Sequence, residues 1–183
     1  MLIKQKLNIM KTVLLLPLLI LTLFSYSQES KTSYKNFILQ EDKTIIWQKV
    51  FETDEIFSDI EQYFSGMSFT SNLILKDSTL MGRSAKSTLS SKSGVVMAAY
   101  GDYDCLILID MKDGKYRVTI SDLKFDPPNI QYASGSFFLS DLAVRDNHFE
   151  IRGNRNNRNL LDILDNDFTS QFIIKIKDKK DDW

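Results

Sequence analysis

Residues Cys105 to Lys124, CLILIDMKDGKYRVTISDLK, contain the strongest structural signal in this sequence. Asp113-Gly114 lies between two runs rich in β-forming residues. An Asp-Gly pair favours a type I′ turn, because both central residues of that turn need a positive φ. The stretch is therefore predicted to form a β-hairpin. It contains no catalytic motif.

A turn at Asp113-Gly114 also determines which residues of the two strands face each other. The predicted pairs are Lys112–Lys115, Met111–Tyr116, Asp110–Arg117, Ile109–Val118, Leu108–Thr119, Ile107–Ile120 and Leu106–Ser121. The side chains that would share one face are all apolar: Ile107, Ile109, Met111, Tyr116, Val118 and Ile120. On the other face, Asp110 and Arg117 are expected to form an ion pair. Since an isolated hairpin is marginally stable in water, we expect a larger sheet backed by helices.

The N-terminus has the features of a secretory signal peptide, predicted as residues 1–27. Lys4, Lys6 and Lys11 precede the apolar run Val13 to Phe24, and Ser25-Tyr26-Ser27 supplies small residues before the predicted cleavage site. A permanent membrane anchor is the weaker alternative, because spanning a bilayer needs about 20 apolar residues. The only cysteine is Cys105, so a lipid-modified cysteine after the leader is excluded. These features predict export to the periplasm or secretion, without choosing between the two.

Cleavage would leave a mildly acidic mature chain. The leader contains three lysines and no acidic residue, so 20 basic and 24 acidic side chains remain, a net charge of −4. This charge argues against general nucleic-acid binding, which relies on basic surface. With one cysteine, the chain cannot form an intramolecular disulfide. Its stability must therefore come from a hydrophobic core.

The rest of the chain alternates between strand and helix patterns. Residues 28–42 are predicted to be a linker or edge segment, 43–177 a single domain, and 178–183 a charged tail. The first predicted elements are a strand at Thr44–Phe51 and a helix that is capped by Thr53 and ended by Gly66. Strands at Phe69–Leu75, Thr79–Ser90 and Val95–Tyr100 are predicted to follow, before the hairpin. After the hairpin we expect a short strand at Phe149–Ile151 and a helix from Leu160 to Phe172. The apolar positions of the first helix are Ile56, Ile60, Tyr63, Phe64 and Met67, and those of the second are Leu160, Leu161, Leu164, Phe168 and Phe172.

These elements predict an α+β fold, an antiparallel β-meander with two helices on one face in the order β-α-β4-α. The hairpin's apolar face should pack under the helices that contain Ile60 and Leu164. Two segments stay open. Residues 129–147 give no clear pattern, although Ser136 to Leu142 fits a short strand or a loop, and residues 172–176 fit either a helix end or a strand.

The arrangement resembles a family of secreted bacterial domains of unknown function with a TBP-like fold. The residues that carry the resemblance are the leader, the strand Ile45 to Phe51 leading into an acidic helix start, and above all Lys112 to Ile120, KDGKYRVTI. It covers roughly residues 43–176. The resemblance implies the fold of the TATA-binding protein's half-saddle, but it implies no activity and no catalytic residues. DNA binding does not follow from such a fold.

Single residues that could take part in chemistry each have a simpler interpretation. His148 is the only histidine and has no second ligand or base nearby in sequence. Cys105 is expected to act as a small hydrophobe in the core. Asp165-Asn166-Asp167 begins like a calcium loop, but Ser170 and Ile176 occupy the positions that need Gly and Glu, so a solvated acidic helix face is favoured.

Two polar clusters are also interpreted as solvated surface. The serines of the Thr79–Ser90 region and the turn that follows it are expected to face water: Ser84, Ser87, Ser90, Ser91 and Ser93. The arginines spaced by three between the last strand and the last helix could hold an anion, but a hydrated connector is the commoner meaning: Arg152, Arg155 and Arg158. Asp102 and Asp104 suit a turn.

The sequence predicts an exported, non-enzymatic domain with no catalytic, cofactor-binding or metal-binding residues. It would bind a small ligand or an envelope protein through its sheet or loop rim. A ligand pocket would lie either between the sheet and the helices or on the uncovered sheet face, where Leu106, Leu108 and Thr119 point. One alternative is a structural module of an envelope assembly, using Thr79–Ser90 as an unpaired edge strand. The other is a hydrolase with a scattered site that includes His148. Neither the ligand nor the oligomeric state follows from the sequence.

Overall fold

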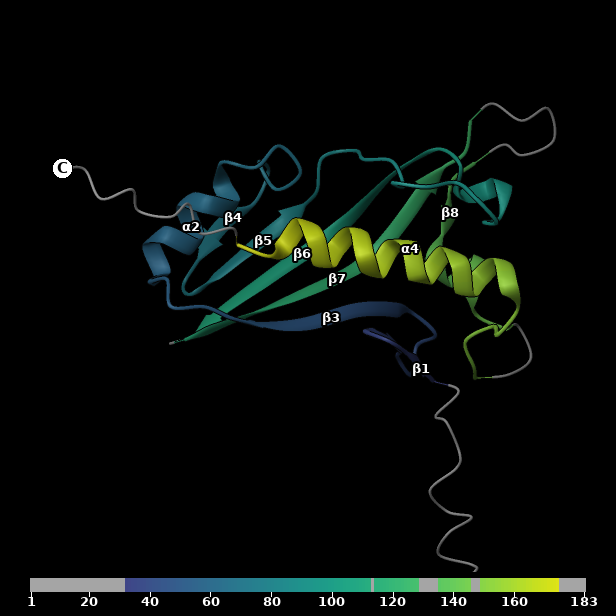
Figure 1. The fold of residues 1–183 in the computed structure, drawn as a ribbon, viewed down its shortest axis with the longest axis horizontal. Helices are drawn as coiled ribbons and strands as arrows, with labels where there is room; N and C mark the ends of the chain where they lie inside the picture. The colour runs from purple at the N-terminus through teal and green to yellow at the C-terminus, as the bar shows by residue number, and fades with distance from the viewer. Residues whose placement is uncertain (1–31, 113, 129–134, 146–148, 175–183) are drawn as a thin grey trace, which may run out of the picture. The chain divides into compact units, whose positions relative to one another are not determined.

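The structure, a computed structural model, describes residues 32–112, 114–128, 135–145 and 149–174. The predicted signal peptide, Asp113 of the hairpin turn, residues 129–134, His148 and the charged tail lie outside these ranges. The described elements, in chain order, are β1 (Ser33–Tyr34), β2 (Phe37–Leu39), β3 (Ile45–Glu52), α2 (Phe57–Ser65), β4 (Ile74–Lys76), β5 (Thr79–Arg83), the 3-10 turn η1 (Met97–Ala99), β6 (Asp102–Lys112), β7 (Lys115–Asp126), β8 (Phe137–Phe138), α3 (Leu139–Ala143) and α4 (Arg155–Phe172) (Figure 1).

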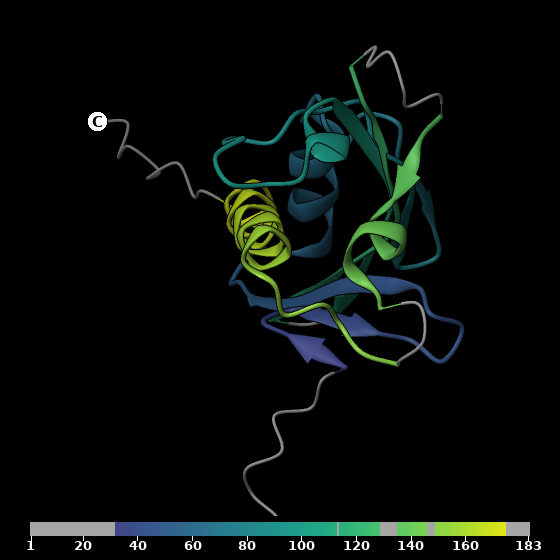
Figure 2. The ribbon, with the colours of Figure 1, turned by 90° about the vertical axis from the view of Figure 1, so that its right-hand side faces the viewer.

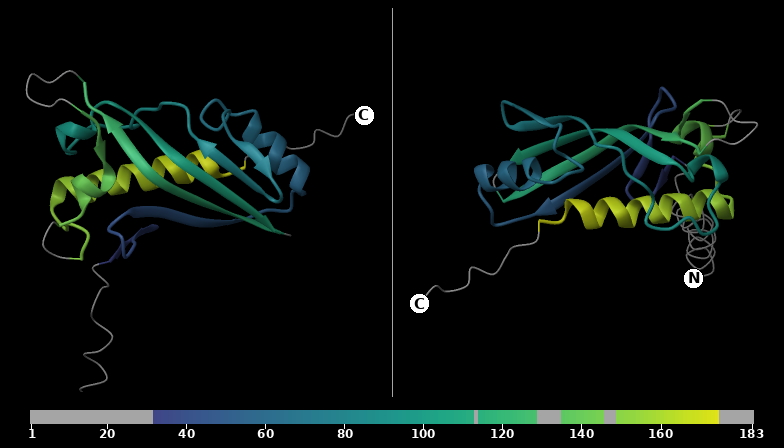
Figure 3. Two further views of the ribbon diagram at one scale, coloured as in Figure 1. Left: turned by 180° about the vertical axis from the view of Figure 1, so that it is seen from behind. Right: turned by 90° about the horizontal axis from the view of Figure 1, so that it is seen from above.

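The strands form one antiparallel sheet in the order β1-β2-β3-β7-β6-β5-β4, and β8 pairs with the far end of β7. The long helix α4 lies across one face of this sheet, and Figure 2 looks along its axis with the strands to one side. Seen from behind, the strands of the sheet lie in front of α4 (Figure 3). The predicted fold class, an antiparallel sheet in an α+β domain, is confirmed.

The β6–β7 hairpin has the predicted register. Every predicted pair is present, from Lys112↔Lys115 at the turn to Leu106↔Ser121. The six side chains predicted to share the apolar face are all buried. Gly114 has a φ of 74°, the positive value that the turn requires. The local turn chemistry and the alternating pattern therefore determined this register together.

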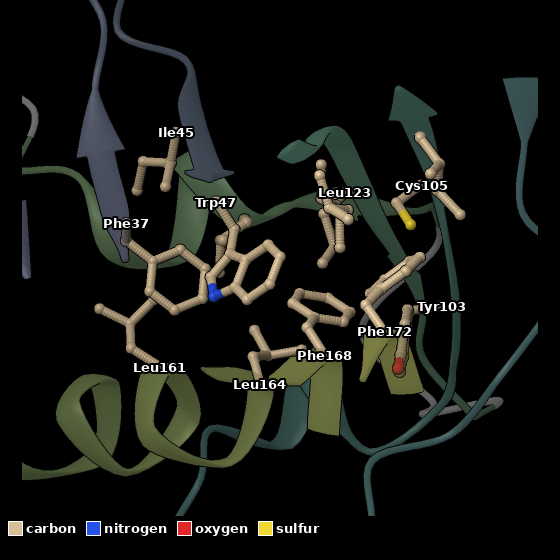
Figure 4. Close-up of a cluster of buried hydrophobic side chains, with 14 of the residues drawn as sticks. Phe37, Ile45, Trp47, Tyr103, Cys105, Leu123, Leu161, Leu164, Phe168 and Phe172 are labelled. Carbon is tan, nitrogen blue, oxygen red and sulfur yellow. The ribbon is translucent and has the colours of Figure 1, made fainter. Parts of the chain in front are cut away.

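Helix α4 buries the whole of its predicted apolar stripe against the sheet. Leu160, Leu161, Leu164, Phe168 and Phe172 have no exposed surface. Figure 4 shows several of these side chains facing strand residues such as Trp47 and Leu123. The ring of Phe168 meets that of Trp47 edge-on at 5.5 Å. Full burial of each large apolar side chain stabilises the fold by roughly 1.5–3 kcal/mol before entropy losses, so this contact dominates the core.

Helix α4 begins earlier than predicted. Asn154 caps it by accepting a hydrogen bond from the Asn157 backbone N–H at 2.9 Å, and the first helical residue is Arg155. The segment expected to be a polar connector is therefore the first turn of the helix. The helix ends at Phe172, so the described residues Ile173 and Ile174 form no strand, and residues 175–176 lie outside the structure's described ranges.

The first helix was predicted to begin at Thr53, which is wrong. Helix α2 starts at Phe57 with Ile56 at the N-cap, and Ile56 is 65% exposed although it was assigned to the apolar stripe. The Thr53 hydroxyl accepts a hydrogen bond from the Glu55 backbone N–H, which makes a local turn before the helix. Ile60 and Phe64 are buried as predicted, and Gly66 is the C-cap.

Three predicted strands of the meander also differ. The strand expected at Phe69–Leu75 is replaced by turns with Phe69 buried, and β4 begins only at Ile74. Strand β5 ends at Arg83 and the chain then leaves the sheet, apart from a bridge between Ser87 and Tyr103. Strand β5 lies between β4 and β6, so it is not the unpaired edge expected of Thr79–Ser90. The segment expected to form a strand at Val95–Tyr100 contains η1 instead, with Val95 and Ala99 turned into the core.

Residues ahead of the predicted domain start belong to the sheet. Strands β1 and β2 extend it beyond β3, and Phe37 and Leu39 are buried. Within residues 129–147, where the sequence shows no clear pattern, Phe137–Phe138 forms β8 and leads into α3. The strand predicted at Phe149–Ile151 is only a single bridge between Ile151 and Val144. Among the described residues, the helices are too short or too polar to cross a membrane.

Candidate functional site

The sheet face opposite α4 is not covered by that helix, and we call it the open face. Strand alternation puts alternate residues of β3 to β7 there. Its side chains include Gln48, Val50, Ile74, Met81, Arg83, Asp104, Leu106, Leu108, Asp110, Arg117, Thr119 and Ser121. Apolar members are well exposed: Ile74 is 66%, Val50 54% and Leu106 45% exposed.

The predicted ion pair lies at the middle of the open face. Arg117 donates to Oδ2 of Asp110 from Nη2 at 2.7 Å and from Nε at 3.2 Å. The Thr79 hydroxyl donates to Oδ1 of the same carboxylate at 3.1 Å, so β5 joins the pair. An exposed ion pair contributes only about 0–1 kcal/mol to stability. Its main effect is to fix the direction of these charges on the open face.

A second charged group lies where β7 has a bulge. The register shifts between Asp104 and Leu106, and Asp122 has a φ of 49°. The guanidinium of Arg83 binds the carboxylates of both Asp104 and Asp122. Bulges turn side chains out of their regular direction, and here the bulge brings Asp122 within reach of Arg83. The charges of the open face are thus largely paired with each other.

The acidic residues of α4 do not form the solvated face that was expected. Asp165 Oδ1 accepts hydrogen bonds from Trp47 Nε1 at 2.9 Å and from Asn36 Nδ2 at 2.7 Å. Asp162 Oδ1 accepts from the Tyr34 hydroxyl at 2.9 Å and pairs with Lys35 at 2.7 Å. These carboxylates attach the N-terminal strands and β3 to the helix. The sequence feature that could have indicated this contact is Trp47, because a buried indole N–H needs a hydrogen-bond acceptor.

The remaining acidic residue of that motif contacts a different segment. Asp167 Oδ2 accepts a hydrogen bond from the Ser90 backbone N–H at 3.0 Å, which holds the loop after β5 against α4. The geometry also argues against an EF-hand loop, because Asp165, Asn166 and Asp167 lie inside the continuous helix α4. In the part of the chain that the structure describes, His, Cys, Asp and Glu side chains form no group able to hold a metal ion.

Cys105 lies in the core, as expected from its position on the apolar face. It has no exposed surface, and burial raises the pKa of its thiol to about 12, so the thiol is protonated at neutral pH. Ser84 was expected to face water but is buried beside it. The Ser84 hydroxyl accepts hydrogen bonds from the Cys105 backbone N–H at 3.0 Å and from its thiol at 3.6 Å. A protonated, buried thiol is a poor nucleophile.

The three arginines do not converge on one point. Arg152 Nε donates to the Val144 carbonyl at 2.7 Å. Arg155 and Arg158 are exposed on the first turn of α4. His148 lies outside the described residues. The candidate serines, arginines and His148 are therefore not brought together into a site by the described structure.

Two hollows are formed by described residues. One, of about 200 Å³, is lined by Thr44, Ile45, Asp122, Leu123, Phe138, Leu139 and Ser140, so it adjoins the Arg83–Asp122 pair. The other, of about 350 Å³, is lined by Phe51, Glu52, Thr53, Asp54, Tyr116, Ile173 and Ile174, and we call it the β3-end pocket. The first is smaller than the roughly 300–1,000 Å³ of typical small-molecule sites, and the second is at the small end of that range.

No protein-family model matches the chain, and no curated protein matches it in sequence. The structure is similar to a TBP-like protein from Parabacteroides distasonis, with a TM-score of 0.49 and 15% identity over 78% of this chain and 96% of that one. It is also similar to a DUF4468 family protein from Bacteroides ovatus, with a TM-score of 0.45 and 11% identity over 81% and 94%. Both neighbours agree with the predicted resemblance to bacterial domains of unknown function with a TBP-like fold. The likeness concerns the fold and does not bear on secretion.

Proposed function

We propose that this protein is an exported, non-enzymatic domain that binds an envelope protein through its open face. One observation carries the proposal. A sheet face without helix cover presents Ile74, Val50 and Leu106 with about half or more of their surface exposed. The partly exposed apolar side chains of Ile74, Met81, Leu108 and Leu106 are neighbours on β4, β5 and β6. Apolar side chains grouped in this way on one face make a surface suited to a partner.

The composition of the open face favours a protein over a small ligand. Its apolar side chains are interspersed with charged groups that are already paired, such as Arg117 with Asp110 and Arg83 with Asp104. Protein interfaces combine apolar contacts with a polar rim in this manner. Small molecules need a concave site, whereas the side chains named above extend over five neighbouring strands of the sheet.

Export and the absence of catalysis are supported by the sequence. The predicted leader at residues 1–27 would deliver the domain to the periplasm or beyond. The sequence has no G-x-S-x-G, Walker or G-x-G-x-x-G motif, and its one thiol is buried and protonated. The hydrolase alternative needs His148, which lies outside the described residues. The alternative of an assembly module through Thr79–Ser90 loses its surface, because β5 is paired on both sides.

Site-specific photo-crosslinking in the native cells tests the proposal. A photoreactive amino acid at Leu106 should give a discrete adduct with one envelope protein. The same probe at Asn166, an exposed position on α4, should not. Leu106→Arg should abolish the complex without lowering the melting temperature, because that side chain contributes little to the core. No adduct at Leu106, or equal adducts at both positions, would refute the open face as the contact surface.

A further inference from the structure

We propose that the free edge of β3 at Val50–Glu52 binds an extended peptide segment of a partner protein by strand addition. The segment would alternate apolar and basic residues, with an apolar side chain in the β3-end pocket and a basic side chain beside Glu52. This site shares Val50 with the open face, but it uses the outward backbone groups of that residue, whereas the open-face proposal uses its side chain.

The direction of the backbone groups follows from two hydrogen bonds. Gln48 N–H donates to the Asn36 carbonyl at 2.9 Å, toward β2, and Thr53 N–H donates to the Gly114 carbonyl at 3.1 Å, toward β7. Backbone groups alternate in direction along a strand, so those of Val50 and Glu52 point away from β7.

Among the described residues, no strand covers the edge at Val50 and Glu52. Strand β2 pairs with β3 only at Ile45, Ile46 and Trp47, and the chain turns away at Lys35, where φ is 52°. In the described ranges, no recorded hydrogen bond from a loop or side chain reaches the outward groups of Val50 or Glu52. Unpaired edge groups of this kind are a template for another strand.

The β3-end pocket lies beside this edge on the core side of the sheet. The rings of Phe51 and Tyr116 are stacked at 5.1 Å, and Ile173, which lines the same pocket, is well exposed. In a strand added at Val50–Glu52, the side chains on the core side would lie next to Phe51. A pocket of about 350 Å³ has room for one branched apolar side chain.

The acidic side chains around the edge indicate that the residues alternating with the apolar ones in the bound segment are basic. Glu52, Asp54, Glu55 and Asp59 follow one another closely, and none forms an ion pair among the residues that the structure describes. Lys115 is the cross-strand neighbour of Glu52, and Lys49 directs its ammonium to the Thr169 hydroxyl at 3.0 Å. Four carboxylates around one neighbouring lysine leave an excess of negative charge, which attracts basic residues. Strand addition obtains affinity from backbone hydrogen bonds and specificity from such alternating side chains.

The test measures binding of a short fluorescein-labelled peptide of alternating lysine and valine by fluorescence anisotropy. Val50→Pro removes the outward N–H while leaving the β3–β7 hydrogen bonds in place, because proline is tolerated where the N–H of an edge strand faces solvent. It should weaken binding about tenfold, since a hydrogen bond is lost and the ring obstructs pairing. The matched control Val50→Thr keeps the N–H and should bind within about twofold of the unaltered protein. Equal binding by the two variants would overturn the proposal.

Three further measurements test the backbone pairing, the charge preference and the separation of this site from the open face. A peptide methylated on its pairing backbone nitrogens should not bind, and this arm decides the question if Val50→Pro fails to fold. A glutamate-for-lysine peptide should also fail, and binding by either peptide would overturn the proposal. Leu106→Arg should leave peptide binding unchanged, which separates this site from the open face.

The identity of the occupant is tested in the same assay. Removing residues 175–183 should leave the affinity unchanged if the partner is another protein. A gain in affinity would instead identify the chain's own tail as the occupant, and a dimer that Val50→Pro dissociates would identify a second copy. Either result would overturn the assignment to a separate partner.

Discussion

The indole of Trp47 donates a hydrogen bond to the carboxylate of Asp165 over 2.9 Å, although the two residues are 118 positions apart in the chain. The same carboxylate oxygen accepts a bond from Asn36 at 2.7 Å. One side chain on α4 therefore holds both β3 and the turn before β2. The acidic residues of this helix act as structural acceptors that attach the helix to the N-terminal edge of the sheet.

Asp165→Ala should destabilise the protein by about 1–3 kcal/mol, because the substitution leaves the buried Trp47 N–H without its acceptor. The measurement is urea unfolding followed by tryptophan fluorescence. Asn166→Ala, at the next and exposed position, is the matched control and should change stability by less than about 0.5 kcal/mol. Equal effects of the two variants would mean that the Trp47–Asp165 bond does not stabilise the fold.

Val118→Asp should prevent folding, because it buries an unpaired charge at the centre of the β6–β7 hairpin, where Val118 has no exposed surface. Thr119→Asp puts the same charge on the open face and should cost no more than about 1 kcal/mol. Circular dichroism distinguishes the two outcomes. A folded Val118→Asp protein would contradict the register of the hairpin.

Gly101→Ala should destabilise the protein by about 3 kcal/mol or more, because the added methyl group would overlap the backbone carbonyl of Asp126. Backbone atoms cannot turn aside as a flexible side chain can. Gly66→Ala, where the nearest atom to the new carbon is 3.3 Å away, should stay within about 1 kcal/mol of the unaltered protein. Melting temperatures of the two variants check the contrast, and similar values would refute the close approach at Gly101.

The ionisation of Asp162 should make the stability of the fold depend on pH in a defined direction. Burial alone would raise the pKa of Asp162, but hydrogen bonds from Lys35 and Tyr34 outweigh it and hold the pKa below the ordinary value of 3.8. The stabilisation is therefore complete above pH 3.8 and is lost as the pH falls through the lower folded-state pKa.

Asp162→Asn should be less stable than the unaltered protein at pH 7 by less than about 1 kcal/mol, because the pair with Lys35 is over a third exposed. The difference should shrink below pH 3.8. Urea midpoints measured from pH 7 down to acid conditions check this. A difference that grows on acidification would contradict the assigned direction.

Cys105 should react with a thiol reagent only when the protein unfolds. The thiol is fully buried and its pKa is raised to about 12, so little thiolate exists at neutral pH and the reagent has no access. Reaction with Ellman's reagent should be undetectable in buffer and complete in denaturant. Rapid labelling of the native protein would show that this end of β6 opens.

The elements predicted well are those whose local and long-range preferences agree. The Asp113-Gly114 turn, the alternation around Val118 and the helical spacing from Leu160 to Phe172 each indicate one structure, and burial follows the pattern. The prediction failed at Thr53 and at Thr79–Ser90. A capping residue at Thr53 also suits a local turn, and polar residues after Arg83 fit an edge strand as well as a loop.

The sequence by itself determined the hairpin register, the apolar face of α4 and the sign of the chain's net charge, because these depend on period, turn chemistry and composition. Only the tertiary structure decided that Asp162 and Asp165 bind the N-terminal strands and that Ser84 lies beside Cys105. It also decided that β3 is left with a free edge beside the β3-end pocket. These features depend on which distant segments meet, and a polar side chain has the same local pattern whether its partner is water or a residue 118 positions away.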